Sequence, residues 1–85
     1  MPYFVYILKS IKEDTYYVGS TQDLDSRLER HNQGRSKYTK AKRPWQLVYR
    51  EKCQSRAEAM SLERKIKARK SKDYIEALVR TSRQT

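Results

Sequence analysis

The chain opens with an unbroken apolar and aromatic run at residues 3–9 (YFVYILK). The run is too short for a helix and is rich in the aromatic and β-branched residues that favour strands. A strand that is apolar on both faces needs cover on both faces, because alternate side chains point to opposite sides of a sheet. The sequence therefore predicts that residues 3–9 form the middle strand of a sheet.

Two further segments complete the predicted sheet. Residues 15–19 carry β-forming side chains after a polar stretch, and they predict a strand that pairs back antiparallel through a loop of about five residues. Residues 45–53 alternate between apolar and polar side chains, as a half-buried strand does. Arg50 and Lys52 are expected on the wetter face of this third strand.

The first predicted helix covers residues 24–33. Asp23 or Thr21 can cap its start, and Gly34 supplies a stop after its last turn. Arg27 lies beside the apolar stripe of this helix rather than opposite to it. The stripe itself consists of residues at helical spacing: Leu24, Leu28 and His31.

Two more helices are predicted after the third strand. Ser55 and Glu58 form a capping box that opens a helix at residues 55–70. Ser71 caps a final helix that runs through Leu78 and Val79. A chain of this length makes one domain. We expect that domain to span residues 1–80, followed by a flexible tail at residues 81–85.

Positive charge is concentrated after residue 26. The whole chain holds 20 Lys and Arg against 10 Asp and Glu, a net charge of +10. Residues 1–26 hold two bases and four acids, whereas residues 27–85 hold eighteen bases and six acids. Two stretches lack acids altogether, residues 35–43 with five bases and residues 64–72 with six. Such clusters are typical of a protein that binds nucleic-acid phosphates, although a solvated surface would explain one isolated cluster.

Composition argues against several other classes of protein. No apolar run approaches the ~18 residues of a membrane span, and the start of the chain lacks a signal-peptide pattern. A single cysteine, Cys53, with a single histidine forms neither an internal disulfide nor a structural zinc site. We expect Cys53 to be a small core residue at a strand end, and the protein to be cytoplasmic with no membrane partner.

Glu63 is the acid whose position most needs a reason. It falls within the inward arc of the helix at residues 55–70, together with Ala59, Leu62 and Ile66. An ionised carboxylate on a packed face is unfavourable unless it is paired, hydrated in a cleft or bound to a metal. Lys67, one turn away, offers an ion pair of only about a few tenths of a kcal/mol. Position alone leaves the ion pair and the metal site equally open.

Five features occur in a fixed order along the chain. Residues 4–6 (Phe-Val-Tyr) precede residues 17–19 (Tyr-Val-Gly), and then Arg27, His31 and Glu63 follow. This order resembles the GIY-YIG nuclease domain family, in which a Gly-Ile-Tyr triad and a Tyr-Ile-Gly triad precede a helix with Arg and His and a metal-ligand helix. Within that family, the chain is similar to a small single-domain bacterial group of uncharacterised proteins.

The resemblance covers nearly all of residues 3–80. Phe4 departs from the family pattern, since a glycine begins the first family triad, but Tyr6 is kept. We expect no attached DNA-recognition module of the kind from which relatives draw specificity, which leaves the choice of target open. The fold implied is a small α+β domain in which helices flank a three-stranded antiparallel sheet, with the site on one face.

The resemblance also implies a role for each site residue. Tyr6 would be the general base that takes a proton from the attacking water, for which its pKa must be depressed from about 10. Glu63 would ligate a single Mg²⁺ or Mn²⁺ ion at the phosphate. Arg27 would neutralise charge that builds on phosphorus. Tyr17 and His31 would orient these groups. Each of these residues also has a plain structural reading, as a strand tyrosine, a surface cation or a helix-end cation.

The predicted function is a metal-dependent endonuclease of low intrinsic specificity. The alternative is a nucleic-acid-binding module that does not turn over, or that acts only with a protein partner. DNA is the expected ligand, although phosphate contacts carry no base information. An acidic protein partner is a third reading of the charge. The residues expected to bind nucleic acid are Arg35, Lys37, Tyr38, Lys40, Lys42, Arg43, Arg64, Lys65 and Lys67.

Overall fold

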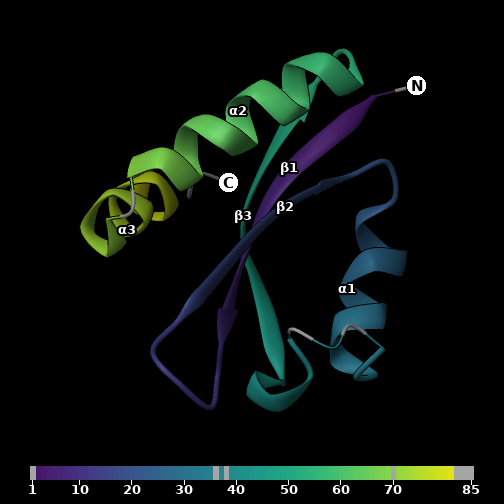
Figure 1. Cartoon of the computed structure of the whole chain (residues 1–85), viewed down its shortest axis with the longest axis vertical. Coiled ribbons are helices and arrows are strands. Elements are labelled where there is room, and N and C mark those ends of the chain that lie inside the picture. The colour runs from purple at the N-terminus through teal and green to yellow at the C-terminus, as the bar shows by residue number, and fades with distance from the viewer. Residues whose placement is uncertain (1, 36, 38, 70, 82–85) are drawn as a thin grey trace.

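Strand β1 (Tyr3–Ser10) is the middle strand of a three-stranded antiparallel sheet with the order β2-β1-β3 (Figure 1). The protein is described by a computed structural model over residues 2–35, 37, 39–69 and 71–81. The predicted mid-sheet strand and the antiparallel three-stranded sheet are therefore confirmed. The other elements are, in chain order, β2 (Tyr16–Thr21), α1 (Leu24–Asn32), the 3-10 helix η1 (Lys40–Lys42), β3 (Trp45–Cys53), α2 (Arg56–Arg69) and α3 (Lys72–Thr81).

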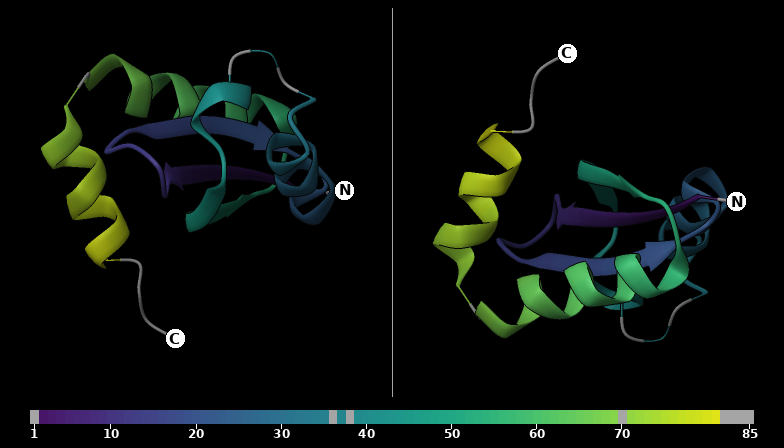
Figure 2. Two further views of the ribbon diagram at one scale, coloured as in Figure 1. Left: turned by 90° about the horizontal axis from the view of Figure 1, so that it is seen from below. Right: turned by 90° about the horizontal axis from the view of Figure 1, so that it is seen from above.

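Helices cover both faces of the sheet, which is why β1 is apolar on both sides. Helices α2 and α3 lie on one face and α1 lies on the other (Figures 1 and 2). Val5 and Ile7 of β1 pack with Ala59 and Ile66 of α2 in the first core cluster. The second cluster lies under α1 and contains Tyr6, Leu8 and Trp45, with Tyr17, Leu24 and Leu28 packed against it. Alternation along β1 thus separates two cores and places Tyr6 on the α1 face.

The strand bounds agree closely with the sequence predictions. The third strand has the predicted ends, and Cys53 is buried at the end of it. Strand β2 continues to Thr21, two residues beyond its predicted end. Register shifts between Ile7 and Leu8 in the β1–β3 pairing, because Ile7 pairs with Tyr49 and Leu8 with Leu47. Such a bulge adds local twist to the pair of strands.

Side chains cap the three helices as predicted. The Asp23 carboxylate accepts from the Ser26 N–H at 3.1 Å and is the cap of α1, whereas Thr21 bonds to the Asp23 backbone. Gly34 follows α1 with φ of 78°, a conformation that favours glycine. Ser55 accepts from the Glu58 N–H, and Ser71 accepts from the Tyr74 N–H.

Two predicted ends fall at the limits of the described residues. Helix α2 ends at Arg69, and Lys70, its predicted last residue, lies outside the described part of the chain. Helix α3 reaches Thr81, the first residue of the predicted tail. The rest of that predicted tail, residues 82–85, also lies outside the described part.

The basic loop (described residues 35, 37 and 39–44) precedes β3, and the buried Ser10 attaches it to the β1–β2 hairpin. The Ser10 hydroxyl donates to the Lys42 carbonyl at 2.6 Å and accepts from the N–H groups of Lys12 and Glu13. The Ile11 N–H also donates to the Pro44 carbonyl at 2.9 Å. The basic loop thus contains the turn η1 and is held against the hairpin by hydrogen bonds.

We expect Ser10→Ala to lower the free energy of unfolding by about 1–3 kcal/mol, because three part-buried backbone groups lose their partner. Urea denaturation followed by circular dichroism measures the change. Ser26→Ala is the matched control, since the Ser26 side chain is exposed on α1 and should shift stability by less than about 0.5 kcal/mol. Equal effects of the two substitutions would contradict the anchoring role of Ser10.

Candidate active site

The two tyrosine-containing triads meet across the β1–β2 pairing. Tyr6 lies opposite Gly19 in the register, and Leu8 lies opposite Tyr17. A Cβ atom at residue 19 would lie 2.6 Å from the Tyr6 hydroxyl oxygen and 3.2 Å from Cε2 of Tyr17. Glycine is needed here because the Tyr6 side chain passes directly over its α-carbon. The glycine of one triad therefore makes room for the tyrosine of the other.

His31, in the last turn of α1, is only 3% exposed and contacts two hydroxyl groups. Its Nδ1 lies 2.8 Å from the Thr39 hydroxyl and its Nε2 lies 3.3 Å from the Tyr6 hydroxyl. Burial, followed by the charges of Arg27 and Arg30, lowers the pKa of His31, which favours the neutral imidazole. When Nδ1–H donates to Thr39, Nε2 is free to accept the Tyr6 proton.

Tyr17 joins these groups into an aromatic cluster on the α1 face. Its ring centroid lies 4.9 Å from that of His31 and 6.3 Å from those of Tyr6 and Trp45. The Trp45 Nε1–H donates to the Thr39 carbonyl at 2.9 Å. The position of the imidazole is thus set by contacts from β2, β3 and the basic loop as well as from β1.

Burial is the largest effect on the pKa of Tyr6 and raises it, because the side chain is only 1% exposed. The neighbouring Tyr17 and Glu63 also raise the pKa, whereas the positive charge of Arg27 lowers it. The Tyr6 pKa reaches about 12. In the protein without a metal ion, the Tyr6 pKa is therefore raised rather than depressed. The depression that a general base requires stays a prediction for the metal-bound site.

Glu63 extends from α2 to the edge of the sheet formed by β2. Its Oε1 accepts from the Ser20 hydroxyl at 2.8 Å, and its Oε2 accepts from the Lys67 ammonium at 2.7 Å. The Glu63 side chain is 21% exposed, so the carboxylate is mostly buried but solvent can still reach it. The ion pair with Lys67 that the spacing suggested is present, and it coexists with a position beside the other site residues.

A cavity of about 400 Å³ brings Glu63 and Arg27 to the same space. Two carboxylates, those of Glu63 and Asp23, line it. The Asp23 carboxylate also caps α1. The complete lining comprises Tyr3, Ser20, Thr21, Gln22, Asp23, Arg27, Arg56, Met60 and Glu63.

This donor set suits one class of metal ion. In the described part of the chain, no group of three or more His, Cys, Asp and Glu side chains is placed to hold an ion. Mg²⁺ needs only one or two protein carboxylates, because it keeps several waters and takes oxygens from substrate phosphates. Glu63 in an open cavity fits such an ion and does not fit zinc.

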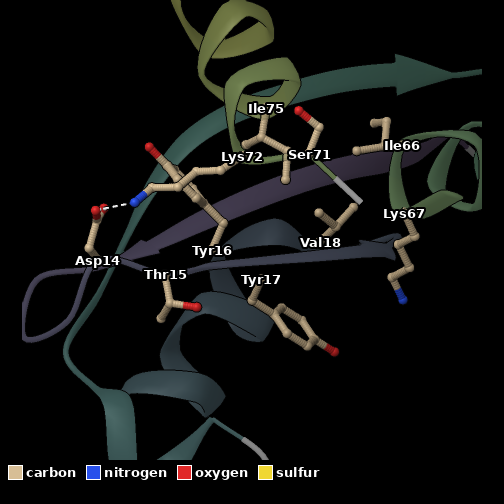
Figure 3. Close-up of a pocket in the computed structure, with 10 residues that line it drawn as sticks. All are labelled: Asp14, Thr15, Tyr16, Tyr17, Val18, Ile66, Lys67, Ser71, Lys72 and Ile75. Carbon is tan, nitrogen blue, oxygen red and sulfur yellow. Dashed lines mark hydrogen bonds and ion pairs between the residues drawn. The ribbon is translucent and has the colours of Figure 1, made fainter. Parts of the chain in front are cut away.

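A second cavity, of about 460 Å³, lies along β2 beside the junction of α2 and α3 (Figure 3). Tyr17 and Lys67 belong to its lining, so it shares residues with the site around Glu63. At its other end, the Lys72 ammonium donates to the Asp14 carboxylate, which joins the hairpin loop to α3 (Figure 3). Val18, Ile66 and Ile75 supply apolar surface between these ends.

The basic residues predicted to bind nucleic acid occupy separate places. Lys37, Lys40 and Arg43 line a third cavity of about 400 Å³, and the structure adds Lys12 from the hairpin loop to this group. Arg35 is exposed and Lys42 is half-buried in the same loop, whereas Tyr38 lies outside the described residues.

The basic residues predicted on α2 are also separated. Arg64 is exposed, and Lys67 pairs with Glu63. Lys65 lines a cavity with Glu51 and Glu58 beside β3, away from β2. The basic stretch of α2 is therefore not one continuous face toward the site.

The sequence analysis missed several residues that shape the site. Gly19 was noted only as part of a triad, and its contact with Tyr6 depends on strand register. Ser20 and Thr39 hold Glu63 and His31, and no spacing pattern indicates such contacts between distant segments. Asn32 holds β3 to α1 through two hydrogen bonds to the Trp45 backbone. Lys12 lies beside Lys37, Lys40 and Arg43 because the hairpin loop contacts the basic loop in the folded chain, a contact that no sequence pattern indicates.

Comparison with known proteins places this geometry in a family. The model of the family described as the GIY-YIG catalytic domain matches residues 2–75. The chain is also 42% identical over 66 residues to the UPF0213 proteins SAV0488 and SA0446 of Staphylococcus aureus strains Mu50 and N315. In each case the match covers 76% of this chain and 79% of the relative.

A solved structure has the same fold. The solution NMR structure of the UPF0213 protein BH0048 from Bacillus halodurans is similar, with a TM-score of 0.60 and 36% sequence identity. The match covers 96% of this chain and 86% of that chain. The α+β architecture and the resemblance inferred from the ordered motifs are both confirmed.

Gly19→Ala is expected to cost about 1–3 kcal/mol of stability, because the added methyl group would overlap the Tyr6 hydroxyl. Chemical denaturation of Gly19→Ala, Tyr6→Phe and the double variant measures the coupling between the positions. Removal of the hydroxyl should relieve part of the overlap, so the double variant should lose less than the sum of the single losses. Strict additivity would contradict the contact.

His31 should make stability depend on pH. Because its folded-state pKa lies below its unfolded value, the unfolded chain binds the proton more readily. His31 therefore favours folding fully above the unfolded pKa of about 6.5, and this contribution is lost as pH falls from that value through the lower folded-state pKa. Denaturation from pH 7.5 to 5 should show a steeper fall for the wild type than for His31→Gln, which removes the only histidine. Parallel profiles would contradict a buried neutral imidazole.

Proposed function

The chain belongs to the GIY-YIG family, a nuclease-type family, and from that premise we propose that it is a metal-dependent endonuclease. The proposal is that it hydrolyses phosphodiester bonds of nucleic acid, with low intrinsic specificity. The supporting observation is that Tyr6 lies near His31, Arg27 and Glu63, and that Arg27 and Glu63 line one cavity at the β2 edge of the sheet. These residues come from three elements, and together they supply a proton acceptor, a cation and a metal ligand.

In this proposal, Glu63 holds one Mg²⁺ or Mn²⁺ ion in the cavity that it shares with Arg27. When bound, such an ion polarises a phosphate oxygen and stabilises the charge of the leaving oxygen. Ser20 keeps the carboxylate of Glu63 directed toward β2 through its 2.8 Å hydrogen bond. Arg27 binds the phosphate from the α1 side and offsets the negative charge that develops on phosphorus.

Tyr6 and His31 act in the proposal as a proton relay. With a pKa of about 12, a free tyrosinate is scarce at neutral pH. The Tyr6 oxygen can instead accept a proton from the attacking water while its own proton passes to Nε2 of His31. The 3.3 Å separation and the neutral imidazole suit this transfer. Tyr17 packs on the imidazole and keeps it aligned.

The nucleic acid is proposed to lie across the basic surface. A cavity is surrounded by Lys12, Lys37, Lys40 and Arg43, and no acid occurs among the described residues that line it. Such a group suits backbone phosphates. Arg35 and Lys42 add positive charge in the same loop, and Tyr38 is the aromatic residue at this point of the sequence. Arg64, Lys65 and Lys67 carry positive charge on α2, apart from this cavity. DNA in the cytoplasm is the proposed target.

None of the described helices is long and apolar enough to span a membrane.

A second candidate function is a nucleic-acid-binding module that requires a partner protein for turnover. The observation that favours it is the burial of Tyr6, whose side chain is only 1% exposed in the protein alone. A partner or a substrate that opened the α1 face would then be needed before water reached the hydroxyl. This candidate predicts tight, salt-sensitive binding without cleavage.

The proposed activity is tested on four substrates, each with Mg²⁺ and with chelator. The substrates are supercoiled plasmid, single-stranded DNA, a branched junction and structured RNA. We expect Mg²⁺-dependent cleavage that falls by about 10²-fold or more in Tyr6→Phe, because the relay loses its hydroxyl. Glu63→Gln should remove the metal-dependent activity, because the proposed metal ligand is lost.

Two control variants separate catalysis from folding. Tyr49→Phe removes the hydroxyl of another buried sheet tyrosine, on the opposite face and bonded to Glu51. Glu76→Gln alters a helical carboxylate that also accepts from a tyrosine, Tyr16. Both should keep wild-type rates. Cleavage that persists in chelator or in Glu63→Gln would contradict the proposal.

A further inference from the structure

Both carboxylate oxygens of Glu63 already have donors in the protein. Ser20 donates to Oε1 at 2.8 Å, and Lys67 donates to Oε2 at 2.7 Å. The two donors differ in kind, because the Ser20 hydroxyl is neutral and the Lys67 ammonium carries a positive charge. A metal ion that binds Glu63 needs an oxygen lone pair and repels a neighbouring cation. Lys67 therefore occupies the place that a divalent cation would take.

The ion pair between Glu63 and Lys67 is weak enough to exchange. Lys67 is 53% exposed, whereas Glu63 is 21% exposed, so the lysine is the partner that can move away. Its flexible four-carbon stem ends in a strongly hydrated ammonium group. Exposed pairs at this spacing on a helix contribute little to stability and are screened by salt. Release of Lys67 should not disturb the fold around Glu63.

Lys67 also borders a cavity next to the site. It lines the cavity beside β2 together with Tyr17, and Asp14 and Lys72 lie at the other end of that cavity (Figure 3). Tyr17 packs against His31, and Lys67 contacts Glu63. The end of the cavity that Tyr17 and Lys67 line therefore adjoins the candidate active site. In a nucleic-acid strand whose scissile phosphate lies between Arg27 and Glu63, we expect a neighbouring phosphate near this end of the cavity.

Resting on the proposed function, we propose that Lys67 is an exchange cation that couples metal binding to nucleic-acid binding. In the metal-free protein its ammonium holds Oε2 of Glu63. When the metal ion takes Oε2, Lys67 is released and contacts a phosphate next to the scissile one. A phosphate that draws Lys67 away likewise frees Glu63 for the metal. Each ligand therefore raises the affinity for the other, and the two effects are equal because the coupling is reciprocal.

Mn²⁺ titration, followed by electron paramagnetic resonance and by broadening of NMR signals around Glu63, measures the exchange without any cleavage assay. Lys67→Gln should bind Mn²⁺ about twofold more tightly or better, because the competing ion pair is gone. Lys52→Gln removes the same charge from an exposed position on β3 and is the matched control, which should bind as the wild type does. Glu63→Gln should lose the site.

The same variants should respond in the opposite direction to nucleic acid. A phosphorothioate-substituted single-stranded oligonucleotide is a suitable probe, because it resists cleavage and keeps its charge. Lys67→Gln should weaken its binding in Mn²⁺ and reduce the slope of log affinity against log salt by about 0.7, the value for one phosphate contact on a single strand. The gain in Mn²⁺ affinity caused by the oligonucleotide should be smaller in Lys67→Gln than in Lys52→Gln.

Three results would overturn the exchange. Weaker Mn²⁺ binding in Lys67→Gln would mean that Lys67 positions Glu63 rather than competes for it. Equal coupling in Lys67→Gln and Lys52→Gln would mean that general charge links the ligands. Mn²⁺ binding unchanged in Glu63→Gln would place the ion elsewhere. A protein that shows the exchange yet cleaves no substrate would retain this inference and lose the proposed function, so the two failures are distinguishable.

Discussion

The pairing of Tyr6 with Gly19 is the contact on which the rest of the site depends. Because residue 19 has no side chain, the Tyr6 ring can cross β2 and reach His31 and Arg27 of α1. A side chain at that position would push the tyrosine out of the α1 core cluster. The same pairing sets Tyr17 beside His31, so one register decides the geometry of the whole aromatic group. Two triads that are distant in sequence are thus one structural unit.

The edge strand β2 joins the two faces of the sheet into one site. Tyr17 lies on the α1 face, whereas Ser20 bonds to Glu63 of α2, which packs on the other face. A carboxylate from α2 and an arginine from α1 therefore line the same cavity, although a three-stranded sheet separates their helices. An edge strand is the place where this is possible, because the sheet ends there. The positive charges of the basic loop are also positioned by the hairpin, because the Ser10 hydroxyl donates to the Lys42 carbonyl.

Local patterns predicted the elements better than their contacts. Features that depend on neighbouring residues could be predicted from the sequence. They are the apolar run of β1, the alternation of β3 and the helix caps Asp23, Ser55 and Ser71. The motif order led to the family and to a set of candidate site residues. The sequence did not predict the raised pKa of Tyr6 or the roles of Gly19 and Thr39. They depend on register, burial and contacts between segments far apart in the chain, which periodicity does not encode.

A metal ion and a phosphate are proposed to bind at one place on the β2 edge of the sheet. Anomalous diffraction from crystals grown with Mn²⁺ and a cleavage-resistant oligonucleotide would locate both. We expect a manganese peak at the Glu63 carboxylate, with a phosphate between it and Arg27 and with Tyr6 facing that phosphate. A manganese ion bound elsewhere, or a nucleic-acid backbone that runs only over the basic loop and leaves Glu63 paired with Lys67, would contradict this proposal.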